Sequence, residues 1–308
     1  MRGRGTILSN GYRSFLAVAE AGSIRAAARE LNIVSSAVNR QVLMLEEDLG
    51  IRLFDRVGRG LRLSEAGHLL LRQVREAVDR HDDVVAELDT LRGLKRGRVR
   101  LATVESIAAD RLPRLLAEFW RRYPGVETGL VVAGAEEVCR LVETSSADIA
   151  FTFSTRELPA MRIVHHEPHA LGAVLAPDHP LAGAASLRLD DLVGEPLVLP
   201  ARGLSLRAAL EPALARIGRA LVVRAECDSL RLTAALVRRA SAIGFMTRVG
   251  IEHELAAGEL AWVPLDDPDL LPDHLDVVAR ERAVPSLAVA ALCDFIEESW
   301  GGAAVSAG

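Results

Sequence analysis

The N-terminal part of the chain contains, at residues 11–63, the stretch GYRSFLAVAEAGSIRAAARELNIVSSAVNRQVLMLEEDLGIRLFDRVGRGLRL. Apolar residues recur at helical spacing in 11–21, in 24–31 and in a segment that begins at residue 35 or 36 and ends at 49. This periodicity predicts three short amphipathic helices.

Residues at the ends of these helices support the same interpretation. Gly22 and Gly50 are placed to end the first and third helices, and Ser23 is a good N-cap for the second. The short connection 32–34 between the last two helices is typical of a helix-turn-helix.

The third helix carries polar residues on the side opposite its apolar stripe. Ser35, Ser36, Asn39 and Arg40 lie there, and such side chains reach base edges and phosphates when a helix enters the major groove. The alternative is an ordinary solvated helix face. With Ser23, these residues are our candidate DNA contacts on the helices.

Alternating residues on either side of a Gly-x-Gly tip predict a small β-hairpin over 51–63. It presents Arg56, Arg59 and Arg62, and a wing of this kind contacts phosphates or enters the minor groove, where Arg is favoured. The alternative is a polar hairpin with no ligand.

A long helix is predicted from Glu65 to about residue 92, with Ser64 as its cap. Its apolar positions follow a heptad spacing, which predicts that the helix pairs with a second copy of itself. These positions are Leu70, Val74, Ala77, His81, Val84, Leu88 and Leu91. A symmetric dimer implies two-fold-related DNA half-sites.

The composition is that of a folded protein of about two domains. The chain has 308 residues, of which 50% are hydrophobic and 26% charged. It has no apolar run long enough for a transmembrane helix and no signal peptide, so we expect no membrane partner. The three cysteines are far apart, which indicates a reducing cytoplasm and no disulfide framework.

Charge divides the chain into a basic front and an acidic body. Residues 1–96 carry 16 Lys and Arg against 13 Asp and Glu, whereas 97–308 carry 21 against 29. This asymmetry indicates a nucleic-acid-binding module joined to another kind of domain.

Over residues 15–71 the string FLAVAEAGSIRAAARELNIVSSAVNRQVLMLEEDLGIRLFDRVGRGLRLSEAGHLLL resembles the LysR-type transcriptional regulators. The resemblance implies a winged helix-turn-helix at 1–63, a linker and dimerisation helix at 64–96, and an effector-binding domain at 97–308. It also implies promoter DNA, a small-molecule effector, a second copy in a homodimer or homotetramer, and RNA polymerase as partners.

One departure from the family pattern lies at the start of the third helix. The family often has Ser-Gln-Pro where this chain has Val34-Ser35-Ser36, and Ser where it has Asn39. We therefore expect the N-cap to shift to Ser35 and the base contacts to differ from the common pattern.

The acidic body alternates strand and helix patterns, which predicts α/β subdomains with parallel sheets and helices on their faces. Among these elements we expect helices over about 107–123 and 230–240 and a strand over 126–132. The strings VLAPDHPLA at 174–182 and AIGFMTRVG at 242–250 resemble the same family. They imply two subdomains of the periplasmic-binding-protein type. We assign 97–162 and 268–300 to the first and 163–267 to the second, with hinge strands near 160–166 and 266–274.

Ligands of open α/β sheets bind beyond the carboxyl ends of the strands, here between the subdomains. Thr103 and Ser106 flank a helix start that could hold a carboxylate metabolite, and Glu105 would oppose an anion if it pointed inward. The remaining effector candidates are Thr152, Arg202, Ser205 and Thr247. For each of these residues, a capping or surface role is the alternative.

Other motifs carry no function of their own. The histidines at 165, 166 and 169 lie in a strand-like segment that points neighbours to opposite faces, so we expect no metal site. Cys227 is expected to be a buried structural thiol. We find no catalytic motif and expect no cofactor. The helix-turn-helix and the heptad helix favour a regulator over an enzyme or a solute-binding protein, which would need neither. An architectural DNA binder without a ligand is the remaining alternative.

Overall fold

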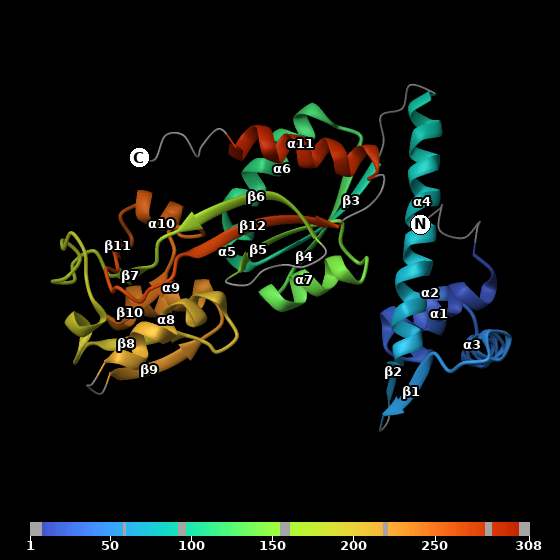
Figure 1. The fold of residues 1–308 in the computed structure, drawn as a ribbon, viewed down its shortest axis with the longest axis horizontal. Helices are drawn as coiled ribbons and strands as arrows, with labels where there is room; N and C mark the ends of the chain where they lie inside the picture. The colour runs from blue at the N-terminus through green and yellow to red at the C-terminus, as the bar shows by residue number, and fades with distance from the viewer. Residues whose placement is uncertain are drawn as a thin grey trace. The chain divides into compact units, whose positions relative to one another are not determined.

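The computed structural model describes residues 8–57, 60–91, 97–154, 161–217, 221–280 and 285–301. The chain folds as two compact units, shown in Figure 1. One comprises Met1–Gly97 with Thr144–Ser146, and the other comprises Arg98–Glu143 and Ala147–Gly308. No helix in the described ranges has both the length and the apolar composition needed to cross a membrane.

The first unit consists of helices around a small apolar core, with a two-stranded hairpin. Its elements are α1 (Asn10–Ala21), α2 (Ile24–Leu31), α3 (Ser35–Leu49), β1 (Phe54–Val57), β2 (Gly60–Leu63) and α4 (Glu65–Leu91). Phe15 is fully buried and its ring lies 5.5 Å from that of Phe54, so the hairpin packs on the helices. The helix-turn-helix and the hairpin are confirmed, with Phe54 paired to Leu63.

Most of the expected helix ends are confirmed. The Ser23 hydroxyl accepts the Ala26 N–H at 3.2 Å, and the Ser64 hydroxyl accepts the Gly67 N–H at 3.0 Å. The expected shift of the α3 cap to Ser35 is wrong. Val34 has the extended conformation of an N-cap and no capping side chain, so Ser35 is already the first helical residue.

The second unit contains two five-stranded sheets with helices packed on them. The first sheet has the strand order β4-β3-β5-β12-β6 and the second β11-β7-β10-β8-β9. The strands are β3 (Gly97–Thr103), β4 (Val126–Val132), β5 (Ile149–Ser154), β6 (Met161–His169), β7 (Gly172–Leu175), β8 (Pro196–Pro200), β9 (Val222–Cys227), β10 (Ile243–Met246), β11 (Ala261–Pro264) and β12 (Asp273–Arg280). The helices are α5 (Glu105–Ala109), α6 (Arg111–Arg122), α7 (Ala135–Glu143), η1 (Leu189–Leu192), α8 (Ser205–Arg216), α9 (Leu230–Ala240), α10 (Glu252–Ala256) and α11 (Leu287–Gly301).

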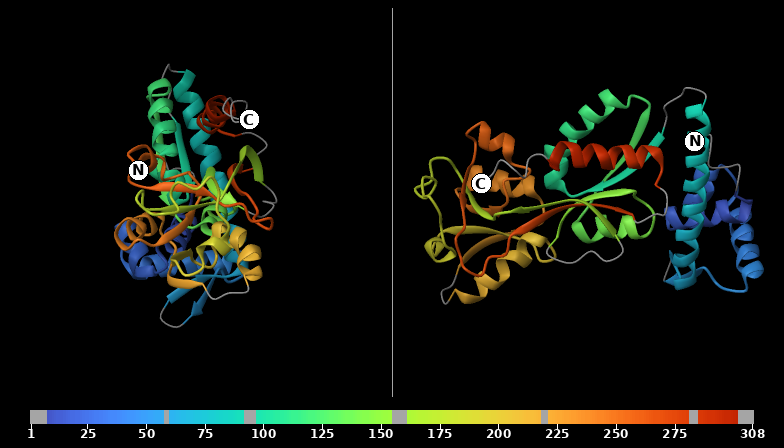
Figure 2. Two further views of the ribbon diagram at one scale, coloured as in Figure 1. Left: turned by 90° about the vertical axis from the view of Figure 1, so that its left-hand side faces the viewer. Right: turned by 45° about the horizontal axis from the view of Figure 1, so that its top comes forward.

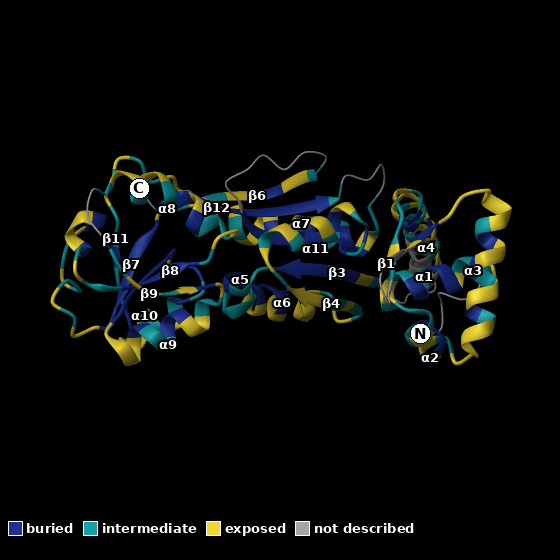
Figure 3. Cartoon of the chain, turned by 90° about the horizontal axis from the view of Figure 1, so that it is seen from below, coloured by how far each residue is buried: buried dark blue, intermediate teal, exposed yellow. Residues whose placement is uncertain are grey.

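Helices cover both faces of the first sheet. Helices α6 and α11 lie on one face and α7 on the other, as Figures 1 and 2 show. Successive residues of a strand point to opposite faces, so Val277 packs with Phe119 while its neighbour Val278 packs with Val138. The central strands β3, β5 and β12 are accordingly buried on both sides, whereas the edge strands β4 and β6 are partly exposed (Figure 3).

Three expectations for this unit need correction. The single helix expected over 107–123 is two helices, because Asp110 leaves the helical conformation. The sheets are mixed rather than parallel, since β12 runs antiparallel to β5 and β6. Residues 163–169, which we assigned to the second subdomain, pair with β12 in the first sheet, so the chain leaves that sheet after His169.

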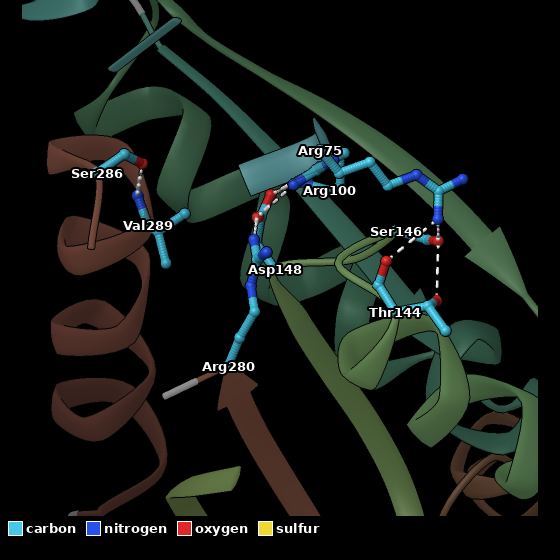
Figure 4. A network of polar contacts seen from close by, with 8 residues as sticks. All are labelled: Arg75, Arg100, Thr144, Ser146, Asp148, Arg280, Ser286 and Val289. Carbon is cyan, nitrogen blue, oxygen red and sulfur yellow. Dashed lines mark hydrogen bonds and ion pairs between the residues drawn. The ribbon is translucent and has the colours of Figure 1, made fainter. Parts of the chain in front are cut away.

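A buried charge cluster joins three strands at the end of the first sheet (Figure 4). Asp148 accepts hydrogen bonds from the backbone and guanidinium of Arg100 at 2.8–3.1 Å, and from Arg280 at 3.0 Å. A buried carboxylate needs such partners, because an unpaired buried charge is strongly destabilising. The cluster therefore holds β3, β5 and β12 in register.

Candidate functional site

The polar face of α3 is free of packing within its unit. Ser35, Ser36, Asn39 and Arg40 are all exposed, while Val38 between them is fully buried (Figure 3). The apolar stripe thus anchors the helix and presents the four polar side chains on its outer side. This is the arrangement that a helix needs in order to enter a DNA groove.

Glu46, which sequence reasoning did not single out, positions the hairpin against α3. Its Oε1 accepts the backbone N–H groups of Leu53 at 2.7 Å and Phe54 at 3.2 Å. A Glu in the last turn of a helix is disfavoured by the helix dipole, and this is the signal that could have revealed its role.

The beginning of α4 closes tightly over the same hairpin. A Cβ on Gly67 would lie 2.1 Å from the carbonyl oxygen of Leu53, so only glycine fits there. Hairpin, α3 and α4 therefore form one rigid assembly, and the position of the wing depends on both contacts.

The structure describes only some of the other side chains that we predict to contact DNA. Arg62 is exposed on β2, whereas Arg59 lies outside the described residues and only the backbone of Arg56 is described. Ser23 is half-buried, and its hydroxyl serves the N-terminus of α2.

The predicted heptad seam of α4 is partly visible. Leu70 is half-buried against the core of the first unit, and Val74 is buried, whereas Ala77 and Val84 are exposed. The side chains of Leu88 and Leu91 lie outside the described part of the chain. Pairing through this seam stays a prediction.

The second unit contains a cleft of about 610 Å³ between the carboxyl ends of its two sheets. Of the residues that we expected to bind an effector, five line it: Glu105, Ser106, Arg202, Ser205 and Thr247. The structure thus brings together residues from α5, α8 and the end of β10 that are far apart in sequence.

Thr103 and Thr152 do not line this cleft. Both are buried, and their hydroxyls donate to the carbonyls of Val104 and Phe153, each at 3.2 Å. Thr152 precedes Phe153 in β5, and Phe153 lines the cleft. Because neighbours in a strand point to opposite faces, Thr152 is directed away from it.

Glu105 does not point toward an anion site of its own helix. Its carboxylate accepts the Leu230 N–H at 2.7 Å and the Ser229 hydroxyl at 3.3 Å. It therefore occupies the N-terminus of α9 on the other side of the cleft, where the helix dipole favours a negative charge.

Asp273 is the cleft residue that sequence reasoning missed. It is 1% exposed, and its Oδ2 accepts the Ser205 hydroxyl at 3.0 Å. Burial raises the pKa of Asp273 to about 7, and repulsion by Asp276 adds to this, while the Ser205 hydroxyl opposes it. The signal available in the sequence was an Asp at the first position of a strand whose apolar residues are buried.

The histidines at 165, 166 and 169 lie in β6, where they contact other protein side chains. His165 packs edge-on against Trp300, whereas His166 stacks on His274 and contacts Asp276 at 2.6 Å. Within the described ranges, no group of three His, Cys, Asp or Glu residues is arranged to hold a metal ion. Cys227 is buried, and its thiol donates to the Ser229 carbonyl.

Family models match both parts of the chain. The model described as "Bacterial regulatory helix-turn-helix protein, lysR family" matches residues 10–68, and "LysR substrate binding domain" matches 92–301. The HTH-type transcriptional regulator CbbR of Rhodospirillum rubrum is 32% identical over 87% of this chain and 88% of its own. The transcriptional activator CmpR of a Synechocystis species is 30% identical over 65% of this chain and 66% of its own.

Solved structures share the fold at lower identity. Full-length OxyR from Pseudomonas aeruginosa superposes with a TM-score of 0.71 at 17% identity, covering 93% of each chain. Full-length CbnR, in complex with its target DNA, superposes with a TM-score of 0.61 at 21% identity, covering 94% of this chain and 98% of its own. The chain therefore belongs to the LysR family of transcriptional regulators.

Proposed function

We propose that this protein is a ligand-controlled, sequence-specific DNA-binding regulator that acts in the cytoplasm and catalyses no reaction. Residues 1–63 read promoter DNA, 64–96 pair two copies, and 97–308 bind a small effector. The observation that carries the proposal is the exposed polar face of α3, held beside an Arg-bearing hairpin by Glu46. Such an assembly contacts base edges with the helix and phosphates with the wing.

Assembly and effector control follow from the same arrangement. A homodimer, or a tetramer made of two dimers, presents two recognition helices to an inverted repeat. An effector in the cleft changes DNA binding or its geometry only if it binds one arrangement better than the other. The complex of CbnR with DNA supports the DNA-binding part, and RNA polymerase is the partner through which such a regulator would act.

Footprinting on the DNA upstream of its own gene, at two salt concentrations, tests the DNA-binding part. We expect a roughly two-fold-symmetric protected site whose affinity falls steeply with salt, because Arg and Lys release counterions from phosphates. No protected site at either salt concentration would contradict the proposal.

The variant Arg40→Ala tests the role of a single side chain. Arg121→Ala is the control, because the side chain of Arg121 is 77% exposed and lies on α6 in the other unit. If Arg40 reads a base edge, its loss costs about 1–3 kcal/mol of binding and relaxes specificity at one position. Unchanged affinity and unchanged site preference would remove Arg40 from the interface. The architectural alternative would be favoured if no small molecule altered the footprint.

A further inference from the structure

The cleft contains a buried carboxylate oxygen that no described residue satisfies with a hydrogen bond. Asp273 is 1% exposed and lines the cleft, and its Oδ1 has no hydrogen-bond partner among the described residues. Leaving a buried acceptor unpaired is costly, so such an atom indicates a group that arrives from outside the chain.

Two further hydroxyls line the same cleft without a hydrogen-bond partner among the described residues. They belong to Ser106, which is 8% exposed, and Thr247, which is 4% exposed, and unlike Oδ1 of Asp273 neither oxygen is a fully buried unpaired atom. With the free oxygen of Asp273 they provide three acceptors. A protonated amine carries three N–H donors and no acceptor, so this set suits it.

The charges that line the cleft favour the same sign of ligand. Its two arginines already have carboxylate neighbours: Arg140 lies 2.5 Å from Glu137 and Arg202 lies 4.0 Å from Glu211. Five acids line the same cleft: Glu105, Glu136, Glu137, Asp228 and Asp273. A cleft with this excess of carboxylates attracts cations and repels anions.

The rest of the lining is apolar. Val104, Val132, Phe153, Leu204 and Leu230 contribute to it. Binding pockets of this kind enclose an apolar ligand body and fix its orientation with a few polar groups.

We propose that the effector of this cleft is a small molecule with a cationic nitrogen on an apolar skeleton, and that Asp273 is its counter-ion. The inference rests on the proposed function, in which the cleft binds an effector. It replaces the carboxylate metabolite expected from the sequence with a ligand of opposite charge. Glu105 supports it, because the protein's own carboxylate already occupies the N-terminus of α9, one of the helix N-termini at the cleft.

Calorimetry and thermal melting of the full chain with three probes of one skeleton test the charge of the ligand. The probes are benzylamine, benzyl alcohol and benzoate, at millimolar concentrations. We expect saturable binding and a raised melting temperature with benzylamine, weaker effects with the alcohol and none with benzoate. Binding of benzoate in preference to benzylamine, or binding of none of the three, would overturn the amine proposal.

Two variants test the role of Asp273. Asp273→Asn, which is close in shape, should weaken benzylamine binding on the order of tenfold or more, because a charge-assisted hydrogen bond is lost. Thr247→Val should weaken it less and keeps the assay informative if the first variant does not fold. Asp178→Asn, at an exposed site outside the cleft lining, is the control.

Equal benzylamine affinity in Asp273→Asn and wild type would exclude Asp273 as the counter-ion. The promoter footprint is measured without any probe, so failure of the amine proposal is distinct from failure of the regulator function. Benzoate binding would leave an effector cleft with another ligand class. A missing footprint would count against the regulator itself.

Discussion

The carboxylate of Glu105 accepts the backbone N–H of Leu230 at 2.7 Å and thereby joins the two sheets of the second unit across the cleft. Glu105 begins α5 beside the first sheet, and Leu230 begins α9 beside the second. An ionised acceptor at a helix N-terminus forms a charge-assisted hydrogen bond and also interacts favourably with the helix dipole. Together with the hydrogen bond from Ser205 to Asp273, this contact joins the two sides of the cleft.

Glu105→Ala should therefore lower the free energy of unfolding by about 1–3 kcal/mol, because two hydrogen bonds are lost and the N–H of Leu230 is left without its acceptor. Thermal denaturation of the full chain measures the change. Glu136→Ala removes an exposed carboxylate from the same cleft and should have almost no effect. Equal melting temperatures for the two variants would show that the Glu105 contact does not stabilise the fold.

Asp273 should make stability depend on pH. Burial raises its pKa from 3.8 to about 7, so the folded chain holds a proton that the unfolded chain releases between these values. Its contribution to stability is fully present below about pH 4 and is lost as pH rises through about 7. The complete loss amounts to ~4 kcal/mol, since each pKa unit corresponds to about 1.4 kcal/mol.

Burial and the groups near Asp273 set this titration. Burial and the charge of Asp276 raise its pKa, whereas the Ser205 hydroxyl on α8 and the backbone N–H of His274 lower it. His169 lies opposite Asp273 on β6. Asp273→Asn should flatten the fall of melting temperature between about pH 4 and 7 and should be the more stable protein at higher pH. If Asp273→Asn and Asp178→Asn show the same pH profile, the shifted titration does not belong to Asp273.

Position 250 requires glycine, because the chain after β10 passes very close to Ser106 of α5. Its φ is +90°, and a Cβ there would lie 2.7 Å from the carbonyl oxygen of Ser106. Gly250→Ala should cost about 2–4 kcal/mol, since both backbone strain and overpacking act against it. Gly258 also has positive φ, at +67°, but open space around its Cβ position, so Gly258→Ala should cost only about 1 kcal/mol. Chemical denaturation measures the free energy of unfolding of both variants. Equal decreases in this free energy would argue against the close approach to Ser106.

Glu46→Ala should loosen the hairpin while the side chains proposed to contact DNA stay unchanged. Two backbone N–H groups lose their acceptor, which we expect to cost about 2 kcal/mol of stability and about tenfold in DNA affinity, because the wing no longer has a set orientation. Glu47→Ala, at the exposed neighbouring position, is the control. Electrophoretic mobility shifts and melting curves give both quantities. If Glu46→Ala binds DNA as tightly as Glu47→Ala, the orientation of the wing does not depend on Glu46.

Local patterns were enough for many elements of this fold. The helix expected over 230–240, the strand expected over 126–132 and the three short helices expected over 11–49 match α9, β4 and α1–α3 of the structure. Each depends on short-range information: apolar spacing, a Ser cap, or a Gly with positive φ. The split between α5 and α6 was not predictable from such a pattern, because the apolar spacing continues through Asp110.

The cleft shows where local information ends. Five of its seven predicted residues line it, because loops after strands converge at the carboxyl edge of a sheet. The unpaired oxygen of Asp273 and the capping of α9 by Glu105 depend on residues far apart in the chain, 125 positions in the case of Glu105 and Leu230. The spacing of apolar residues along the chain reveals the period of a helix or strand. Burial and hydrogen-bond partners exist only once distant segments have packed against one another. The acidic character of this cleft therefore depends on the tertiary structure, which brings its carboxylates together.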